Sequence, residues 1–410
     1  MIIGIDGNEA NVAKRVGIGE YSFELLRQFR EFKTQHIMFS IYLKDKPRPD
    51  MPKEGENWKY TITGPKRFWT QIGLPLYLFT HFPRPNVFFT PSHYAPRFSP
   101  IPTIVSIMDL SYIHFPQLFK KNDLYQLRRW TRYSAKNAAK ILTISNASRD
   151  DILKEYKKNE KDVIVTHLGI KKVESEKLKM QNMDEIKSKF GIGGKYILFV
   201  GTLQPRKNIV RLIEAFSFVV DSERGPVSGF PPANAPSATS SKEVRVVGNP
   251  STSAIPPRPN LQLVIVGKKG WQYEEILAAP KKYDVEDKVF FLDFVTDEDL
   301  PSLYKHAEVF VLPSLYEGFG LPVLEAMKYG CPVITSNVSS LPEAGGDAAL
   351  YIDPQSTQDI ADTIEQVITD KKLRERMIEK GYEQCKRFSW EKTARETLEI
   401  LEEVATPKKL

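Results

Sequence analysis

A pair of glutamates in a glycine-rich segment gives the clearest chemical signal in the chain. Glu317 and Glu325 lie in EGFGLPVLEAM, which follows an apolar run ending at Leu312. The glycines let backbone amides approach a ligand, and the helix expected from Pro322 adds its positive end, so an anion such as a diphosphate can be held. Carboxylates beside that turn suit the hydroxyls of a sugar. The segment predicts a nucleotide-sugar site; the alternative is a structural turn with two surface glutamates.

A second loop supplies positive charge. The strand expected at 196–200 leads through GTLQPRKN into a helix, with Arg206 and Lys207 at the helix start. The helix dipole disfavours cations there, so we expect an anion beside them. Two cations aimed at phosphates would stabilise the charge that builds on a departing diphosphate. Taken alone, the loop fits ordinary surface charge equally well.

A third loop, near the N-terminus, carries Gly17 and Gly19 at the mouth of a helix expected at 20–29. It can approach a phosphate or a sugar, but it is not a complete GxGxxG motif. A dehydrogenase would also need an acidic residue at the end of the second strand, where only Asp45 is available. The loop therefore supports a sugar or phosphate contact more than a dinucleotide site.

Three side chains follow strands of the first half and could face a cleft: His93, Asp109 and His114. The triplet 297–299 has the DxD form of a metal site, but it follows Thr296 and precedes a helical pattern. Acids in that place cap a helix and favour its first turn, so we interpret the triplet as helix capping. We predict no metal site.

The elements that must position these loops alternate between β-branched strands and helices, the pattern of parallel-sheet α/β domains. The pattern restarts after residue 183, which predicts two doubly wound domains at 1–183 and 184–388, a final helix in 389–410, and a Pro/Ser-rich insert at 221–260. Ligands of such sheets bind at the carboxyl ends of the strands, where the loops lie. The expected strands are 2–5, 38–43, 87–90, 103–107, 140–144, 163–166, 196–200, 261–266, 289–294, 309–312, 332–335 and 349–352.

Composition excludes several protein classes. With 410 residues, 41% hydrophobic and 27% charged, the chain is typical of a globular protein of two or three domains. No apolar run is long enough to span a bilayer, and the first residues lack a secretory signal, so we expect a cytoplasmic protein. Cys331 and Cys385 form no CxxC pair, which disfavours a disulfide framework and a structural zinc site.

Charge is unevenly distributed. Residues 1–183 hold 30 Lys and Arg against 18 Asp and Glu, a balance of +12, and the remainder holds 28 against 33, a balance of −5, which together give +7. The basic half predicts a surface for an anionic membrane, a lipid-phosphate acceptor or nucleic acid, with a solvated face as the alternative. The segment 115–140 is expected to form a basic helix that either lies on a membrane or packs its apolar side on the sheet. No nucleic-acid-binding module is present, so nucleic acid is not expected as a partner.

Together these motifs resemble the retaining GT-B glycosyltransferases of family 4, also called group 1, and in particular their mannosyltransferase-like members. The most specific motif is E(x7)E at Glu317 and Glu325; supporting segments are GTLQPRKN, LTISNASRDDI, VTHLGI, LVIVGKKG and LPEAGGDAALYIDP. The resemblance covers nearly the whole chain outside the insert. It implies two Rossmann-like domains around a cleft, with the acceptor in the first domain, the nucleotide-sugar in the second, and the final helix crossing back.

The resemblance also implies a role for each candidate residue. Glu325 would bind ribose, Glu317 would lie by the donor sugar, and Val295 would lie near the base. The remaining donor contacts would come from Gly17, Gly19, Phe319, Gly320 and Leu321. Catalytic roles would fall to Asp109, Arg206, Lys207 and Glu317, and acceptor contacts to His93 and His114. Two positions depart from the family pattern: Met108 stands where a histidine is frequent, and Thr202 where an arginine is frequent.

The activity implied is transfer of a sugar with retention of configuration, without a metal ion or other cofactor, through an oxocarbenium-like state in which a phosphate oxygen takes the acceptor proton. GDP-mannose is the first donor to expect and UDP-sugars the second. The acceptor would be a saccharide or a lipid-linked saccharide for surface polysaccharide, at the inner face of the membrane. A lipid-linked acceptor would fit the basic helix at 115–140 and the aromatic-rich stretch 68–89. The alternative from another class is a non-catalytic sugar- or polyanion-binding protein of the same fold, which would need neither the cations nor the glutamate pair.

Overall fold

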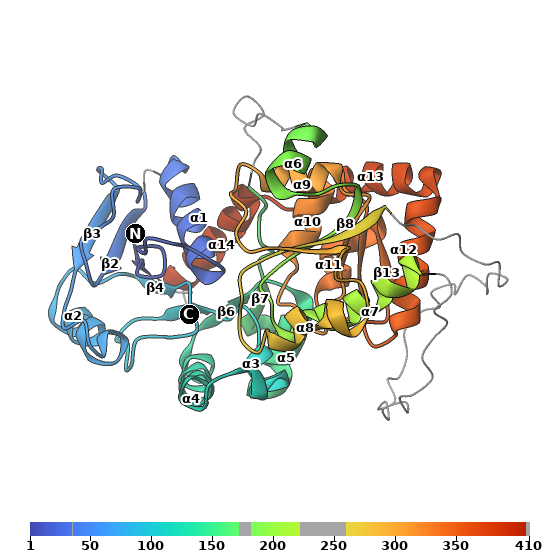
Figure 1. The fold of residues 1–410 in the computed structure, drawn as a ribbon. Helices are drawn as coiled ribbons and strands as arrows, with labels where there is room; N and C mark the ends of the chain where they lie inside the picture. The colour runs from blue at the N-terminus through green and yellow to red at the C-terminus, as the bar shows by residue number, and fades with distance from the viewer. Residues whose placement is uncertain (35, 172–181, 222–259, 407–410) are drawn as a thin grey trace.

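The computed structural model describes residues 1–34, 36–171, 182–221 and 260–406, and the insert predicted at 221–260 lies almost wholly outside them. Two parallel sheets form the architecture (Figure 1). The first has seven strands in the order β3-β2-β1-β4-β5-β6-β7, and the second has six in the order β10-β9-β8-β11-β12-β13. The predicted fold class of two doubly wound parallel-sheet domains is confirmed.

The first domain places its helices on both faces of the seven-stranded sheet. Its elements are β1 (Ile2–Asp6), α1 (Ile18–Glu31), β2 (Met38–Leu43), β3 (Trp58–Ile62), the π-helical turn η1 (Trp69–Gly73), α2 (Leu74–Thr80), β4 (Val87–Thr90), β5 (Thr103–Ser106), α3 (Ser111–His114), η2 (Pro116–Leu118), α4 (Lys121–Asn137), β6 (Lys140–Thr143), α5 (Asn146–Tyr156), η3 (Glu160–Asp162) and β7 (Val163–Val165).

The second domain repeats the plan and ends with a long helix. Its elements are α6 (Met183–Phe190), β8 (Lys195–Val200), η4 (Pro205–Lys207), α7 (Ile209–Val220), β9 (Leu261–Val266), α8 (Glu274–Lys282), β10 (Val289–Leu292), α9 (Leu300–His306), β11 (Val309–Leu312), α10 (Leu321–Lys328), β12 (Val333–Ser336), α11 (Leu341–Gly345), η5 (Gly346–Ala348), β13 (Ala349–Ile352), α12 (Thr357–Thr369), α13 (Lys371–Cys385) and α14 (Trp390–Ala405). Among the described residues no helix is long and apolar enough to cross a membrane.

The sequence prediction missed one strand. β3 pairs with β2 alone at the edge of the first sheet, and of its five residues only Trp58 is buried. An edge strand with one covered side carries fewer apolar residues than a central parallel strand, so the run WKYTI gives a weak signal. β10 is also shorter than predicted, because its pairing with β9 stops at Leu292 rather than at Phe294.

The basic segment predicted at 115–140 resolves into η2 and α4, and its apolar side is covered. Leu124 and Leu127 pack against a buried cluster of the first domain, and the ring of Trp130 lies 5.3 Å from that of Tyr94. Its arginines, such as Arg128, face solvent. Of the two readings that the sequence allowed for this helix, packing on the sheet is the observed one.

Two contacts fix the domains against each other. α14 returns to pack on α1 and β4, with the ring of Trp390 6.3 Å from that of Tyr21. In the second contact, the carboxylate of Glu343 accepts hydrogen bonds from the amides of Asn146 (2.8 Å) and Ala147 (3.0 Å). A side chain of one domain thus caps a helix of the other. Burial raises the pKa of Glu343, but these bonds and His167 outweigh it and hold the pKa below its usual value.

Candidate active site

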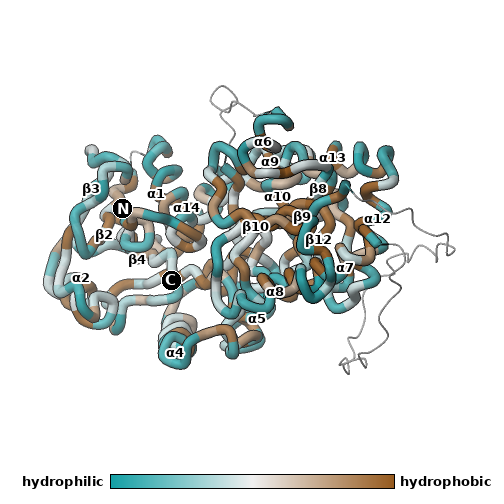
Figure 2. Tube along the Cα trace, in the orientation of Figure 1, coloured by the Kyte–Doolittle hydropathy of each residue, from teal (hydrophilic) through white to brown (hydrophobic). Residues whose placement is uncertain are grey.

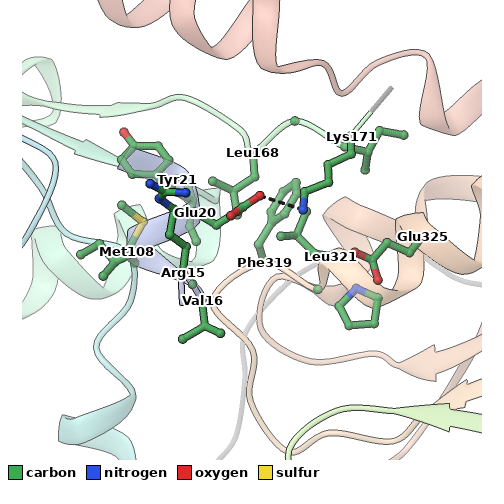
Figure 3. A pocket seen from close by; sticks show the side chains of 18 of the residues that line it. Arg15, Val16, Glu20, Tyr21, Met108, Leu168, Lys171, Phe319, Leu321 and Glu325 are labelled. Atoms are coloured by element: carbon green, nitrogen blue, oxygen red, sulfur yellow. Dashed lines mark ion pairs between the residues drawn. The ribbon is translucent and has the colours of Figure 1, made fainter. Parts of the chain in front are cut away.

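A cavity of about 780 Å³ lies between the domains, where the loops after the strands of both sheets meet. This is the crevice in which doubly wound sheets bind ligands. Figure 3 shows side chains of both domains pointing into it, among them Arg15, Glu20 and Tyr21 from the first and Glu325 from the second. Of the predicted site residues, eight line the cavity: Gly17, His93, Asp109, Glu317, Phe319, Gly320, Leu321 and Glu325.

Glu317 is held by a dense set of donors. Lys207 Nζ and the Ser314 hydroxyl (2.7 Å) both donate to Oε1, and Arg206 Nη1 donates to Oε2 at 3.2 Å. The main chain of Glu317 is fixed as well, since its carbonyl accepts from the hydroxyls of Ser339 (2.9 Å) and Ser340 (2.8 Å). The side chain is therefore rigid before any ligand binds.

The charge of Glu317 follows from these neighbours. The residue is only 7% exposed, and burial by itself raises the pKa of its carboxyl. The positive charges of Lys207 and Arg206 and the bonds to Oε1 outweigh burial and lower the pKa below its usual value. Glu317 is thus an ionised carboxylate with both oxygens already bonded.

Arg206 and Lys207 reach the site through Glu317. Neither is among the residues that line the cavity, although the loop that carries them is bonded to the glutamate turn by Leu315 N to Arg206 O (2.8 Å). Lys207 is 7% exposed, while the Arg206 side chain keeps a quarter of its surface exposed. The structure brings the predicted cations and the first glutamate together in one charged cluster.

Glu325 occupies the first turns of α10, directly after the glycine turn. Gly320 precedes the helix with φ of 105°, a conformation that favours glycine. Tyr304 donates from its hydroxyl to Oε2 of Glu325 at 3.1 Å. Burial raises the pKa of Glu325, and the bond from Tyr304 and the charge of Lys328 only partly oppose it. The two glutamates therefore line one cavity in opposite electrostatic states, the first stabilised as an anion and the second destabilised.

The first domain faces this turn with Asp109 and His93. A Cβ built on Gly318 would lie 2.8 Å from Asp109 Oδ2 and 3.1 Å from its Cβ, so the two domains touch at this point and a larger residue would displace the Asp109 side chain. Asp109 Oδ1 accepts the amide of Ser111 at 2.8 Å. Burial lowers the pKa of His93 despite the opposing charge of Asp109, and its buried Nδ1 has no partner within the described residues.

Three charged residues bridge the two domains along the wall of the cavity. Lys171 Nζ lies 2.9 Å from Glu20 Oε1 in α1 and 3.6 Å from Asp297 Oδ2 in the second domain, and Figure 3 marks the first of these pairs. The sequence prediction gave none of these residues a part in the site, and it assigned Asp297 to helix capping. The available signal was their place just after strands or at helix starts, which many surface residues share.

The remaining predicted residues lie outside the cavity. Gly19 is packed so closely that a Cβ would meet the Glu9 carbonyl at 3.0 Å, and Val295 is buried in the core at 8% exposure. His114 points to Asp151, with Nε2 2.8 Å from Oδ2, in a contact that also takes the Tyr316 hydroxyl at 3.0 Å. Several residues that line the cavity were not predicted as site residues from the sequence: Glu9, Arg15, Tyr94, Lys328, Tyr329 and Trp390.

Comparison with known proteins gives a consistent picture. A family model described as glycosyl transferases group 1 matches residues 252–384. The chain is 30% identical over 295 residues to O-antigen chain mannosyltransferase B of Escherichia coli, covering 72% of this chain and 68% of that protein. It is also 30% identical over 220 residues to the serotype-specific mannosyltransferase WbdA of Escherichia coli, but spans only 23% of that protein.

Solved structures with the same fold cover almost the whole chain. Sucrose-phosphate synthase from Thermosynechococcus elongatus superposes with a TM-score of 0.68 at 17% identity, over 98% of both chains. Anabaena Alr3699/HepE, in complex with UDP and glucose, superposes with a TM-score of 0.66 at 15% identity, over 98% of this chain and 99% of that one.

Proposed function

Because the chain belongs to the group 1 glycosyltransferases and has the GT-B fold, we propose that it moves a hexose from a nucleotide-sugar to a saccharide or lipid-linked acceptor with retention of configuration. One observation carries the proposal. The two glutamates of the E(x7)E motif line a single interdomain cavity, and the first is bonded to the two cations predicted to meet a diphosphate.

In the proposed complex the glycine turn and α10 hold the donor. The amides of Phe319, Gly320 and Leu321 would meet phosphate or sugar oxygens at the positive end of α10. Glu325, whose ionised form is disfavoured in the empty protein, would gain two donors from the ribose hydroxyls. That gain would offset the cost of burying its charge.

Glu317 is better suited to bind the sugar than to attack it. Each of its oxygens already accepts bonds from cations or a hydroxyl, so its lone pairs are largely occupied. A carboxylate in that state is a weak nucleophile. This supports the front-face route, in which a leaving-phosphate oxygen takes the acceptor proton while Arg206 and Lys207 stabilise the charge on the diphosphate. These two cations would perform the role for which other enzymes use a metal ion, so we propose a metal-independent reaction.

We place the acceptor at the wall formed by the first domain, near Asp109 and the unpartnered Nδ1 of His93. GDP-mannose is the first donor that we propose and a UDP-sugar the second, since one relative is named for mannosyl transfer and a structure of the same fold holds UDP and glucose. The relative named for the O-antigen supports a part in surface-polysaccharide synthesis. For a lipid-linked acceptor, we propose peripheral contact of the basic domain with the inner face of the membrane.

The proposal is tested by thermal-shift titration with GDP-mannose, UDP-glucose and their free nucleotides, followed by product analysis by NMR. We expect selective stabilisation by one nucleotide-sugar, slow release of its nucleotide without acceptor, and an α-linked product from an α-linked donor. Glu325→Gln should weaken nucleotide stabilisation. Stabilisation without any turnover would favour the non-catalytic binding protein, and an inverted product would overturn the retaining mechanism.

A further inference from the structure

The outer side of the helix formed by η1 and α2 is apolar and uncovered. Phe68, Ile72, Leu76 and Phe79 expose 52%, 52%, 57% and 47% of their surface. Their spacing of four, four and three residues places them on one side of the helix. The opposite side, with Trp69, Leu74 and Leu78, is buried against the first domain. A helix that is apolar on both sides needs a second apolar environment.

Two further aromatic residues extend this surface. Phe82 follows α2 and is 74% exposed, and Phe98 is 75% exposed. Arg97 N donates to Thr70 O at 2.9 Å, which brings the loop of Phe98 beside η1. We call the six residues Phe68, Ile72, Leu76, Phe79, Phe82 and Phe98 the α2 face. α2 lies at the end of the molecule that is remote from the second domain (Figure 1), and Figure 2 colours several residues of α2 as apolar.

The chain segment that carries the α2 face is basic, although one of its cations, Lys66, pairs with Asp45 from outside the segment. Residues 57–108 contain five Lys or Arg and no Asp or Glu. Arginines lie over the exposed rings, with the guanidinium of Arg67 5.1 Å from the Phe68 ring centroid and that of Arg84 4.3 Å from the Phe82 ring centroid. A partner that accepts this surface must be apolar within and negatively charged at its boundary.

We propose that the α2 face docks on the surface of an anionic lipid bilayer. Exposed aromatic and aliphatic side chains suit the acyl boundary, and arginines around them suit the phosphates of the headgroups. A second protein chain would need a complementary acidic rim around an apolar centre, whereas an anionic bilayer offers that combination everywhere. The inference rests on the proposed membrane-proximal function and specifies which surface carries it.

The α2 face also differs from the other basic surface of the domain. α4 has exposed cations such as Arg128 and Lys136, but its apolar stripe is packed against the core. Charge alone gives weak, salt-sensitive attraction, while charge beside exposed apolar area gives stable attachment. The two surfaces therefore make a matched pair for experiment.

The test is flotation of the full chain with vesicles of phosphatidylcholine alone and with added phosphatidylglycerol. Leu76→Gln with Phe79→Gln should weaken binding to anionic vesicles by at least roughly ten-fold, and Arg67→Gln with Arg84→Gln by roughly five-fold for each arginine. Arg128→Gln with Lys136→Gln, which removes the same charge from α4, should have a smaller effect. Thermal melts and nucleotide release from a nucleotide-sugar without lipid should match wild type in all three.

The outcomes separate the surface from the proposed function. Binding to anionic vesicles that is lost only with the α2-face variants supports the proposal. Absence of vesicle binding by the wild type, unaltered binding by both α2-face variants, or a dimer that these variants dissociate would overturn it. Vesicle binding without any use of a nucleotide-sugar would leave the surface intact and refute the transferase activity instead.

Discussion

Lys207→Met tests the charged cluster beneath the cavity. Lys207 and Glu317 are each 7% exposed and directly bonded, so the substitution leaves a buried carboxylate with Arg206 as its remaining cation at 3.2 Å. Breaking a buried pair costs about 3–5 kcal/mol, and because Arg206 remains we expect a loss of about 3 kcal/mol. For a domain of this size, that loss lowers the melting temperature by roughly 6–12 °C.

A second substitution isolates the charge effect. Lys207→Met with Glu317→Gln removes the unpaired carboxylate, so we expect it to regain more than half of the stability lost in the single variant. Lys195→Met is the matched control, because Lys195 pairs with Glu308 at 3.0 Å but its side chain is 72% exposed. Such a surface pair contributes about 1 kcal/mol or less.

Calorimetry and turnover measurements provide the two assays. The single and double variants should both lose turnover by roughly 100- to 1000-fold, since each lacks the cation proposed to stabilise the diphosphate. Stability and activity thus respond differently in the double variant. If Lys207→Met melts and turns over like wild type, or if the two substitutions are simply additive in stability, the reasoning from the cluster is refuted.

Three further predictions address the other walls of the site. Burial raises the pKa of Glu325, so its ionisation costs folded-state stability as pH rises through that pKa. Glu325→Gln should therefore raise the melting temperature of the ligand-free protein at about pH 8 but not at about pH 4, while nucleotide affinity falls roughly ten-fold or more. Gly318→Ala places a Cβ 2.8 Å from Asp109 Oδ2 and should reduce turnover by roughly ten-fold or more. Gly193→Ala is the control, because the nearest atom to its added Cβ would be 3.5 Å away, and it should leave turnover unchanged. Equal effects of the two variants on turnover would contradict the close contact. Because the pKa of Glu343 is lowered in the folded protein, its carboxylate stabilises the fold above its ordinary pKa, and this stabilisation is lost as pH falls through the lowered pKa. Glu343→Ala should therefore lower the free energy of unfolding by about 1 kcal/mol at about pH 7 and by progressively less towards about pH 3, as measured in thermal melts.

The candidate membrane-binding surface shows what the sequence could predict and what only the structure could show. The charge count indicated a basic first half, and the sequence offered two elements in it for a lipid-linked acceptor, the basic helix expected at 115–140 and the aromatic-rich stretch 68–89. In the structure, α4 buries its apolar stripe, while α2 exposes its own. Helical periodicity shows that a stripe exists, whereas only the packed neighbours show whether the stripe is covered.

What the sequence determined by itself is local. Strand, glycine turn and helix follow one another within a few tens of residues, so the fold class and the loop of Glu317 and Glu325 could be predicted from patterns of spacing and β-branching. The meeting of Lys171 with Glu20, of Glu343 with Asn146, and of Gly318 with Asp109 joins residues that are more than 120 positions apart. Lys171 also meets a second partner, Asp297 of the second domain, at a similar separation. Apart from the pair of Lys171 with Glu20, which lies within residues 1–183, these contacts depend on how two finished domains dock, and the docking is set by buried surfaces that no local pattern records.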